Sequence, residues 1–117
     1  MGASSISHAD QANGIRTIGL IGRLDMEGAE EVEATMETLT TDEGLRVVAD
    51  ITRVSFLASA GIRVLINAAR SLNQRGGRMV LVLGDNPQVR ETLEFTGITM
   101  VIPSFDSGDQ AASELLA

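Results

Sequence analysis

The sequence predicts an α/β fold, a mixed β-sheet of about five strands with helices packed against it, in the order ββαβαβαβα. Short apolar runs alternate along the chain with longer segments in which apolar residues recur every three or four positions. The segments that join the later apolar runs are long enough to hold a helix, and such crossovers make adjacent strands parallel. Apolar residues make up 44% of the 117 residues, which suffices for one core, so we expect a single domain over 1–117.

The first half of the chain is expected to form a hairpin, a helix and a third strand. Ile6 lies in a first edge strand, and the Asn-Gly pair at 13–14 predicts a tight turn into a second strand over 15–21. Asp25 is expected to cap the helix that follows. The apolar stripe of this helix would contain Ala29, Val32, Met36 and Leu39. A loop then leads into a strand over 45–51.

The segment 47–72 is the most informative part of the chain. An apolar strand and a run of small residues at 58–61 lead directly into a helix, and Ser59 is expected to be the N-cap of that helix. Arg63 lies one turn beyond Ser59 on the exposed face. The opposite, apolar face contains Ile62, Leu65, Ile66, Ala69 and Leu72. Because helix N-termini carry a partial positive charge, a phosphate at this serine would lie in a favourable field.

The rest of the chain continues the alternation of helices and strands. A Gly-Gly pair ends the helix before a strand over 78–83, which is apolar enough to be buried on both faces. The Asn-Pro pair at 86–87 begins a third helix, and Gly97 closes it. We expect a final strand over 99–102 and a terminal amphipathic helix over 106–117. The apolar face of that last helix would contain Ala111, Ala112, Leu115 and Leu116.

Composition argues against several classes of function. The chain has 16 acidic and 9 basic residues, and its net charge of −7 repels nucleic-acid phosphates and anionic lipid headgroups. We therefore expect no direct binding to nucleic acid and no membrane binding. Cysteine is absent, His8 is the single histidine, and the carboxylates are scattered, so we expect no metal and no cofactor. No apolar run approaches the roughly 18 residues of a membrane span, and no signal peptide precedes the first strand, so the expected location is cytoplasmic.

Three stretches of the chain resemble one known family. Residues 50–65, DITRVSFLASAGIRVL, are similar to the signature of the STAS domain, as found in bacterial anti-sigma-factor antagonists. Residues 22–25, GRLD, resemble the Gly-x-Leu-Asp turn of that family, and residues 76–81, GGRMVL, resemble its Gly-Gly strand entry. The resemblance covers nearly the whole chain and implies a STAS-like fold.

The same resemblance implies a function. In that family a serine of the signature loop is phosphorylated by a serine kinase that is itself the anti-sigma factor. The unphosphorylated antagonist binds this kinase and frees the sigma factor, and a PP2C-type phosphatase restores the unphosphorylated form. By this resemblance Ser59 is the phosphorylation site, and the chain is an anti-sigma-factor antagonist in a partner-switching pathway. Ala58 stands where the family usually has aspartate. The expected partner-binding residues are Asp25, Ala58, Ser59, Ala60, Gly61 and Arg63.

Two other functions stay open from the residues. One is a constitutive scaffold or regulatory subunit of a lipid-transport ATPase or stress-signalling complex, with Ser59 purely structural; Ala58 favours this alternative. The other is a small enzyme or nucleotide-binding protein, but no lysine follows Gly61 as a phosphate-binding loop requires. A hydrolase elbow requires glycine two residues before and two residues after its serine, and here Leu57 and Gly61 occupy those positions. We therefore expect no enzymatic activity. Asp25 and Gly61 also have structural explanations, as a helix cap and as a site of close packing. The residues leave open whether the chain acts as a monomer or as a homodimer.

Overall fold

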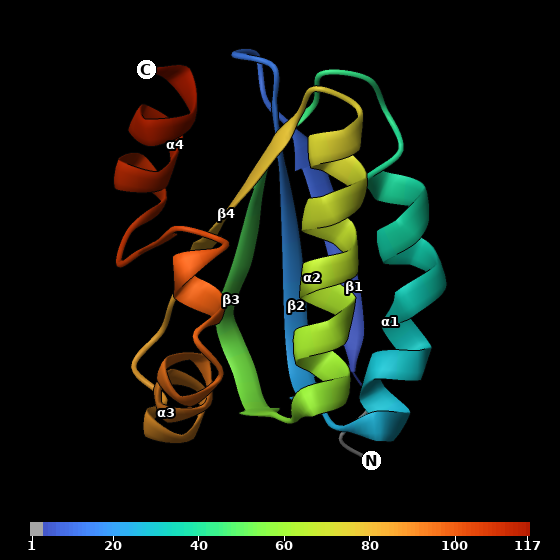
Figure 1. Cartoon of the computed structure of the whole chain (residues 1–117), viewed down its shortest axis with the longest axis vertical. Helices are drawn as coiled ribbons and strands as arrows, with labels where there is room; N and C mark the ends of the chain where they lie inside the picture. The colour runs from blue at the N-terminus through green and yellow to red at the C-terminus, as the bar shows by residue number, and fades with distance from the viewer. Residues whose placement is uncertain (1–3) are drawn as a thin grey trace.

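A single five-stranded sheet organises the molecule (Figure 1). The structure, a computed structural model, describes residues 4–117. Its strands follow one another across the sheet in chain order, with β1 antiparallel to β2 and the later neighbours parallel. The described elements are β1 (Ser5–Asp10), β2 (Ile15–Leu24), α1 (Met26–Leu39), β3 (Arg46–Leu57), α2 (Ser59–Gln74), β4 (Arg78–Val82), α3 (Pro87–Thr96), the 3-10 helix η1 (Ile98–Met100), β5 (Ser104–Phe105) and α4 (Gly108–Leu116). The predicted fold class and the order ββαβαβαβα are confirmed.

Helices cover both faces of the sheet. Figure 1 shows α1 and α2 side by side in front of the strands, with α3 and α4 to the left. Val89 and Leu93 of α3 pack in the same core as α1 and α2, whereas Ala111 and Leu115 of α4 pack in a separate cluster. Alternate residues of β3 divide between the two layers, since Val47 packs in the larger core under α1 and α2 and Val48 packs in a smaller cluster under α4. Val80 of β4 belongs to that smaller cluster and Leu81 to the larger core. Burial on both faces explains why the sequence of β4 is an unbroken apolar run.

The hairpin and the caps of α1 and α3 form as predicted. Gly14 has a φ of +86°, and the turn is closed by a 2.9 Å hydrogen bond from the Gln11 amide to the Ile15 carbonyl. Asp25 caps α1 by accepting from the Gly28 amide. Asn86 caps α3, with Pro87 in its first turn. These signals are local, so they could be recognised without knowledge of the tertiary fold.

β2 and β3 are longer than predicted. β2 extends to Leu24 and β3 to Leu57, whereas the expected strands ended at positions 21 and 51. The added part of β3 is covered on one face only, so buried Val54 and Leu57 are interspersed with exposed polar side chains and the apolar run is broken. The extension carries both strand ends to the edge of the sheet where α1 and α2 begin.

The predicted strand over 99–102 is wrong. Residues Ile98–Met100 form η1, and the fifth strand lies further on at Ser104–Phe105. Gly97 has a φ of +71°, and the chain then makes a helical turn in which the Ile102 amide donates to the Ile98 carbonyl over 2.8 Å. Ile98 and Ile102 are both buried while Met100 between them is 89% exposed. A strand would place these three side chains on one face, so the burial pattern is that of a helical turn. The terminal helix forms, but Leu116 is 48% exposed and lies outside the buried face.

Candidate functional site

The loop around Ser59 lies where β2 and β3 end together. The two strands are parallel neighbours, so their carboxyl ends reach the same rim of the sheet. The Ala58 amide donates to the Leu24 carbonyl over 3.0 Å and thereby joins the start of α2 to the end of β2. Asp25 follows Leu24 directly, so the turn into α1 lies beside the turn into α2. The structure therefore brings the predicted residues of the two turns to one rim.

Ser59 is the first residue of α2 and not its N-cap, which corrects the expectation from sequence. Ala58 occupies the cap position in an extended conformation, and no side chain caps this helix. The helix begins one residue earlier than predicted because apolar periodicity fixes the buried face of a helix more sharply than its first residue. Ser59 is exposed, and its hydroxyl makes no hydrogen bond within residues 4–117. The side chain is therefore accessible to another protein.

Gly61 is buried because the first turn of α2 presses against the strand ends. A Cβ atom at this position would lie 2.8 Å from the Leu24 Cβ, 2.8 Å from the Leu57 Cδ1 and 2.9 Å from the Leu24 carbonyl oxygen. Packing alone therefore requires glycine here. Ala58 and Ala60, on either side of Ser59, are half-buried. These small residues hold the loop close to the sheet and leave Ser59 as the exposed side chain between them.

Asp25 fixes the neighbouring turn. One carboxylate oxygen accepts from the Gly28 amide at 2.9 Å, and the other lies 3.3 Å from the Arg23 guanidinium. The hydrogen bond from Gly28 and, to a smaller extent, the interaction with Arg23 hold the pKa of Asp25 below its ordinary value. Asp25 is thus ionised at neutral pH and committed to the start of α1.

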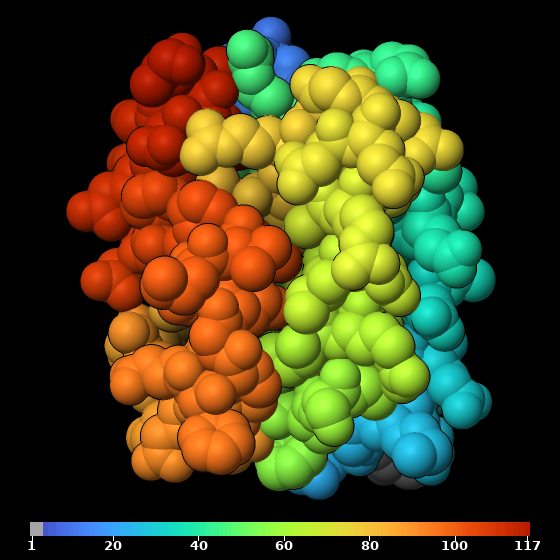
Figure 2. All heavy atoms as spheres, viewed as in Figure 1, coloured from blue at the N-terminus to red at the C-terminus, as the bar shows by residue number. Residues whose placement is uncertain are grey.

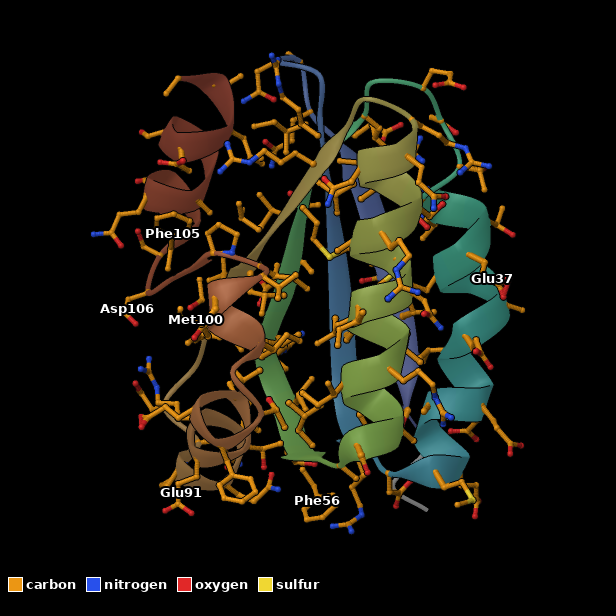
Figure 3. All side chains as sticks on the ribbon, in the orientation of Figure 1. Glu37, Phe56, Glu91, Met100, Phe105 and Asp106 are labelled. Atoms are coloured by element: carbon orange, nitrogen blue, oxygen red, sulfur yellow. The ribbon has the colours of Figure 1, made fainter. Side chains whose placement is uncertain are left out.

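A stacked pair at the same rim was not found by sequence reasoning. The Arg23 guanidinium lies over the Phe56 ring, 4.4 Å from its centroid, because the two residues are partners in the register of β2 and β3. Figure 3 shows Phe56 projecting beyond the sheet below the start of α2. Arginine and aromatic side chains often dominate protein interfaces. Only the register of the strands brings this pair together, so the sequence held no local signal for it.

The first turn of α3 braces the end of β3. The Gln88 side-chain amide accepts from the Leu57 amide and donates to the Leu57 carbonyl, both at 2.8 Å. Asn86 donates to the Ser55 carbonyl over 3.0 Å. These bonds hold the strand immediately before the Ser59 loop. They too join residues about thirty positions apart and were missed from sequence.

Arg63 lies on the exposed side of α2, one turn beyond Ser59, as predicted. Residues four apart are neighbours on a helix surface. The rim thus presents a free hydroxyl, a stacked arginine and phenylalanine, and a second arginine. Within residues 4–117 no three His, Cys, Asp or Glu side chains gather as a metal site would require. In the same residues, no helix is long and apolar enough to cross a membrane.

A family model of the STAS domain matches residues 7–111. The chain belongs to the STAS domain family. Three curated relatives carry names from the anti-sigma factor antagonists. BtrV of Bordetella bronchiseptica, named provisionally as an antagonist, is 33% identical over 104 residues, covering 89% of each chain. The anti-sigma-B factor antagonist of Listeria monocytogenes is 32% identical over 85 residues, covering 73% of this chain and 74% of its own. The anti-sigma F factor antagonist of Paenibacillus polymyxa is 28% identical over 103 residues, covering 87% of each.

Several solved structures of anti-sigma factor antagonists superimpose on this chain. An anti-sigma factor antagonist from Mycobacterium paratuberculosis superimposes with a TM-score of 0.88 at 22% identity, covering 99% of this chain and 97% of that one. Unphosphorylated SpoIIAA, an anti-sigma factor antagonist, gives a TM-score of 0.76 at 21% identity, with 96% of each chain covered. Its phosphorylated form from Bacillus gives 0.65 at 21% identity, covering 94% of this chain and 98% of that one. At these identities the likeness establishes the fold.

Proposed function

We propose that this STAS domain is an anti-sigma factor antagonist whose binding to an anti-sigma factor is controlled by phosphorylation of Ser59. The observation that carries the proposal is the exposed, unbonded hydroxyl of Ser59 at the start of α2, in a loop that otherwise exposes no hydroxyl. The names of the relatives and the existence of SpoIIAA in both phosphorylation states support it.

The binding surface that we propose is the rim around Ser59. It contains Asp25, Ala58, Ser59, Ala60 and Arg63, with Gly61 acting from beneath by letting α2 approach the sheet. The stacked pair Arg23 and Phe56 extends this surface. Because the loop is braced by β2 and α3, the partner would meet a preformed surface and lose little free energy to ordering.

Phosphorylation would act on the interface rather than on the fold. A phosphate adds about −1.5 to −2 charges at neutral pH, and a helix N-terminus stabilises such a charge by roughly 0.3 to 1 kcal/mol. A dianion placed in a desolvated contact without a partner costs far more than the about 2.8 kcal/mol that lowers affinity a hundredfold. The unphosphorylated form would therefore bind the anti-sigma factor and the phosphorylated form would release it.

The partners that this function requires are a serine-kinase anti-sigma factor and a PP2C-type phosphatase, which would return Ser59 to the unphosphorylated state. Such a cycle operates on sigma factors, so we place the protein in the cytoplasm and assign it a binding function without catalysis.

The decisive experiment is intact-mass spectrometry after incubation with the cognate anti-sigma factor kinase and ATP. Wild type is expected to gain one phosphate and Ser59→Ala none. Ser55→Ala is the matched control, because Ser55 is also an exposed serine but lies near the end of β3, before the loop, and this variant should still gain one phosphate. Equal phosphorylation of Ser59→Ala and wild type would exclude Ser59 as the site.

A second candidate function rests on Ala58. The family usually has aspartate at this position, and its loss would favour a constitutive scaffold in which Ser59 is not modified. Affinity purification from cells separates the two functions. Recovery of a transporter ATPase or stress-signalling complex, with no kinase and no phosphate on Ser59, would favour the scaffold.

A further inference from the structure

Charge is distributed very unevenly along this chain. Residues 51–84 contain no aspartate or glutamate, although the whole chain has 16 acidic and only 9 basic residues. The basic residues of that acid-free segment are Arg53, Arg63, Arg70, Arg75 and Arg78. The helix α1, in contrast, carries only negative charge, at Glu27, Glu30, Glu31, Glu33 and Glu37. An acidic protein therefore contains one helix, α2, whose charged side chains are all positive.

The two positive side chains of α2 lie in one line with Ser59 along the exposed face of the helix. Ser59, Arg63, Asn67 and Arg70 are exposed and follow one another at intervals of three or four residues, so they lie in one line along the helix. We call these four residues the α2 stripe. Figure 2 shows α2 as a continuous band on the front of the molecule, with α1 at one side and the C-terminal segments at the other.

The arginines of the α2 stripe are not used by the fold. The ion pairs among residues 4–117 involve Arg16, Arg23, Arg78 and Arg90, and none involves Arg63 or Arg70. Neither residue has a carboxylate three or four positions away with which to form an intrahelical pair. A groove of about 380 Å³ separates α2 from α1, with Glu33 and Glu37 among its lining residues. Arg63 and Arg70 are not among the residues that line this groove, and both side chains are exposed to solvent.

We propose that the α2 stripe is the binding surface for an acidic patch of the partner protein. This inference rests on the proposed function and adds the chemistry of the partner: carboxylates aligned along α2, opposite Arg63 and Arg70. A second copy of this chain is less suitable as the occupant, because two molecules that each carry a net charge of −7 repel one another.

The position of Ser59 at the end of the stripe gives the switch a specific physical basis. Before phosphorylation the stripe carries two positive charges and attracts the partner's carboxylates. A phosphate on Ser59 adds about −1.5 to −2 charges and cancels them. It also sets like charge against the carboxylates nearest the start of α2, which is costly across an interface. Phosphorylation would therefore remove the attraction that steers the two proteins together.

The test is a matched pair of charge reversals, measured by calorimetry against the cognate serine-kinase anti-sigma factor. The double variant Arg63→Glu, Arg70→Glu changes the α2 stripe. The control Arg46→Glu, Arg53→Glu makes the same change in net charge on exposed residues of β3, away from the helix. We expect the stripe variant to bind at least about tenfold more weakly than wild type and the control to bind within about twofold. Circular dichroism and thermal unfolding of each variant check that the fold is retained.

Salt dependence provides the second measurement. Raising NaCl from about 50 to about 300 mM is expected to weaken wild-type binding severalfold and to have little effect on the neutral variant Arg63→Gln, Arg70→Gln. Equal losses of affinity in the stripe variant and the control, or no loss in the stripe variant, would overturn the role of the α2 stripe while leaving the proposed function intact. If the wild-type chain binds no such kinase, both the proposed function and the role of the α2 stripe are overturned. A dimer of wild type in sedimentation that the stripe variant abolishes would identify a second copy as the occupant instead.

Discussion

At position 61 a single missing methyl group decides how close α2 can come to the sheet. The three contacts that a Cβ would make, with Leu24 and Leu57, are all shorter than real Cβ atoms tolerate, and one of them is to backbone. Ser59 two residues earlier is presented on top of this contact. The identity of the buried glycine therefore determines where the exposed serine lies.

Gly61→Ala is expected to destabilise the protein by about 1 to 3 kcal/mol, because α2 or the end of β2 must move to admit the methyl group. Urea unfolding measures the effect. Gly108→Ala is the matched control, since a Cβ at this helical position meets nothing within 4 Å, and it should be neutral or slightly stabilising. Equal stability of the two variants would show that α2 is not tightly seated.

Among the elements, α3 positions the site without belonging to it. Gln88 in its first turn pairs with both backbone groups of Leu57 in the way that another strand would. Gln88→Ala should cost about 1 to 3 kcal/mol because it leaves these part-buried groups unpaired. It should also increase amide hydrogen exchange at 55–59. Gln110→Ala, on the exposed side of α4, is expected to change neither quantity.

The helix α4 closes the second face of the sheet through few residues. Leu115 is 3% exposed and packs in the smaller cluster with Val48 and Val80, whereas its neighbour Leu116 is 48% exposed. Leu115→Ala is expected to lower the free energy of unfolding by about 2 to 4 kcal/mol. Leu116→Ala should change it by less than about 0.5 kcal/mol. Similar effects of the two substitutions in denaturant titrations would mean that α4 is not held in the packing described.

The sequence predicts elements whose signals are local and fails where distant residues decide. Helix ends are predicted correctly at Asp25, Asn86 and Gly97. The first two residues are N-caps in the structure and the third is a C-cap. Residues 99–102 were predicted as a strand because β-branched and apolar residues dominate a short window. In the structure Ile98 and Ile102 are buried and Met100 is exposed, which is the pattern of a helical turn.

The candidate site divides in the same way. The loop, its serine and Arg63 follow from the spacing of small and apolar residues in the segment that ends β3 and begins α2. The stack of Arg23 on Phe56 and the brace from Gln88 depend on strand register and on contacts between segments far apart in the chain. No window of the sequence contains both partners of either interaction.

For the molecule as a whole, stability should fall in acid. The hydrogen bond from Arg16 lowers the pKa of Asp10, and the hydrogen bond from the Gly28 amide lowers the pKa of Asp25. A carboxyl group whose pKa is lower in the folded state stabilises the fold above its unfolded pKa, and the stabilisation is lost as pH falls through the folded pKa. We therefore expect the unfolding temperature to decline below about pH 4.

The variant Asp10→Asn, Asp25→Asn checks this expectation. It should be less stable than wild type at neutral pH and should show a flatter decline of unfolding temperature in acid. Glu43→Gln, in the exposed loop before β3 and outside the ion pairs of residues 4–117, serves as the control and should follow the wild-type curve. Parallel curves for the double variant and wild type would mean that other carboxyl groups govern acid unfolding.

The order of strands across the sheet bears on how the protein reaches its native state. Because every strand pairs with the one that precedes it in the chain, no pairing depends on a distant segment. The first pairing closes a hairpin turn, and each later one encloses only the helical crossover that leads into it, so the entropic penalty of closure stays modest. Such a topology can assemble stepwise during translation, with the hairpin as the nucleus on which later units condense. Newly synthesised chains would then spend little time with open strand edges, which limits misassembly in a crowded cell.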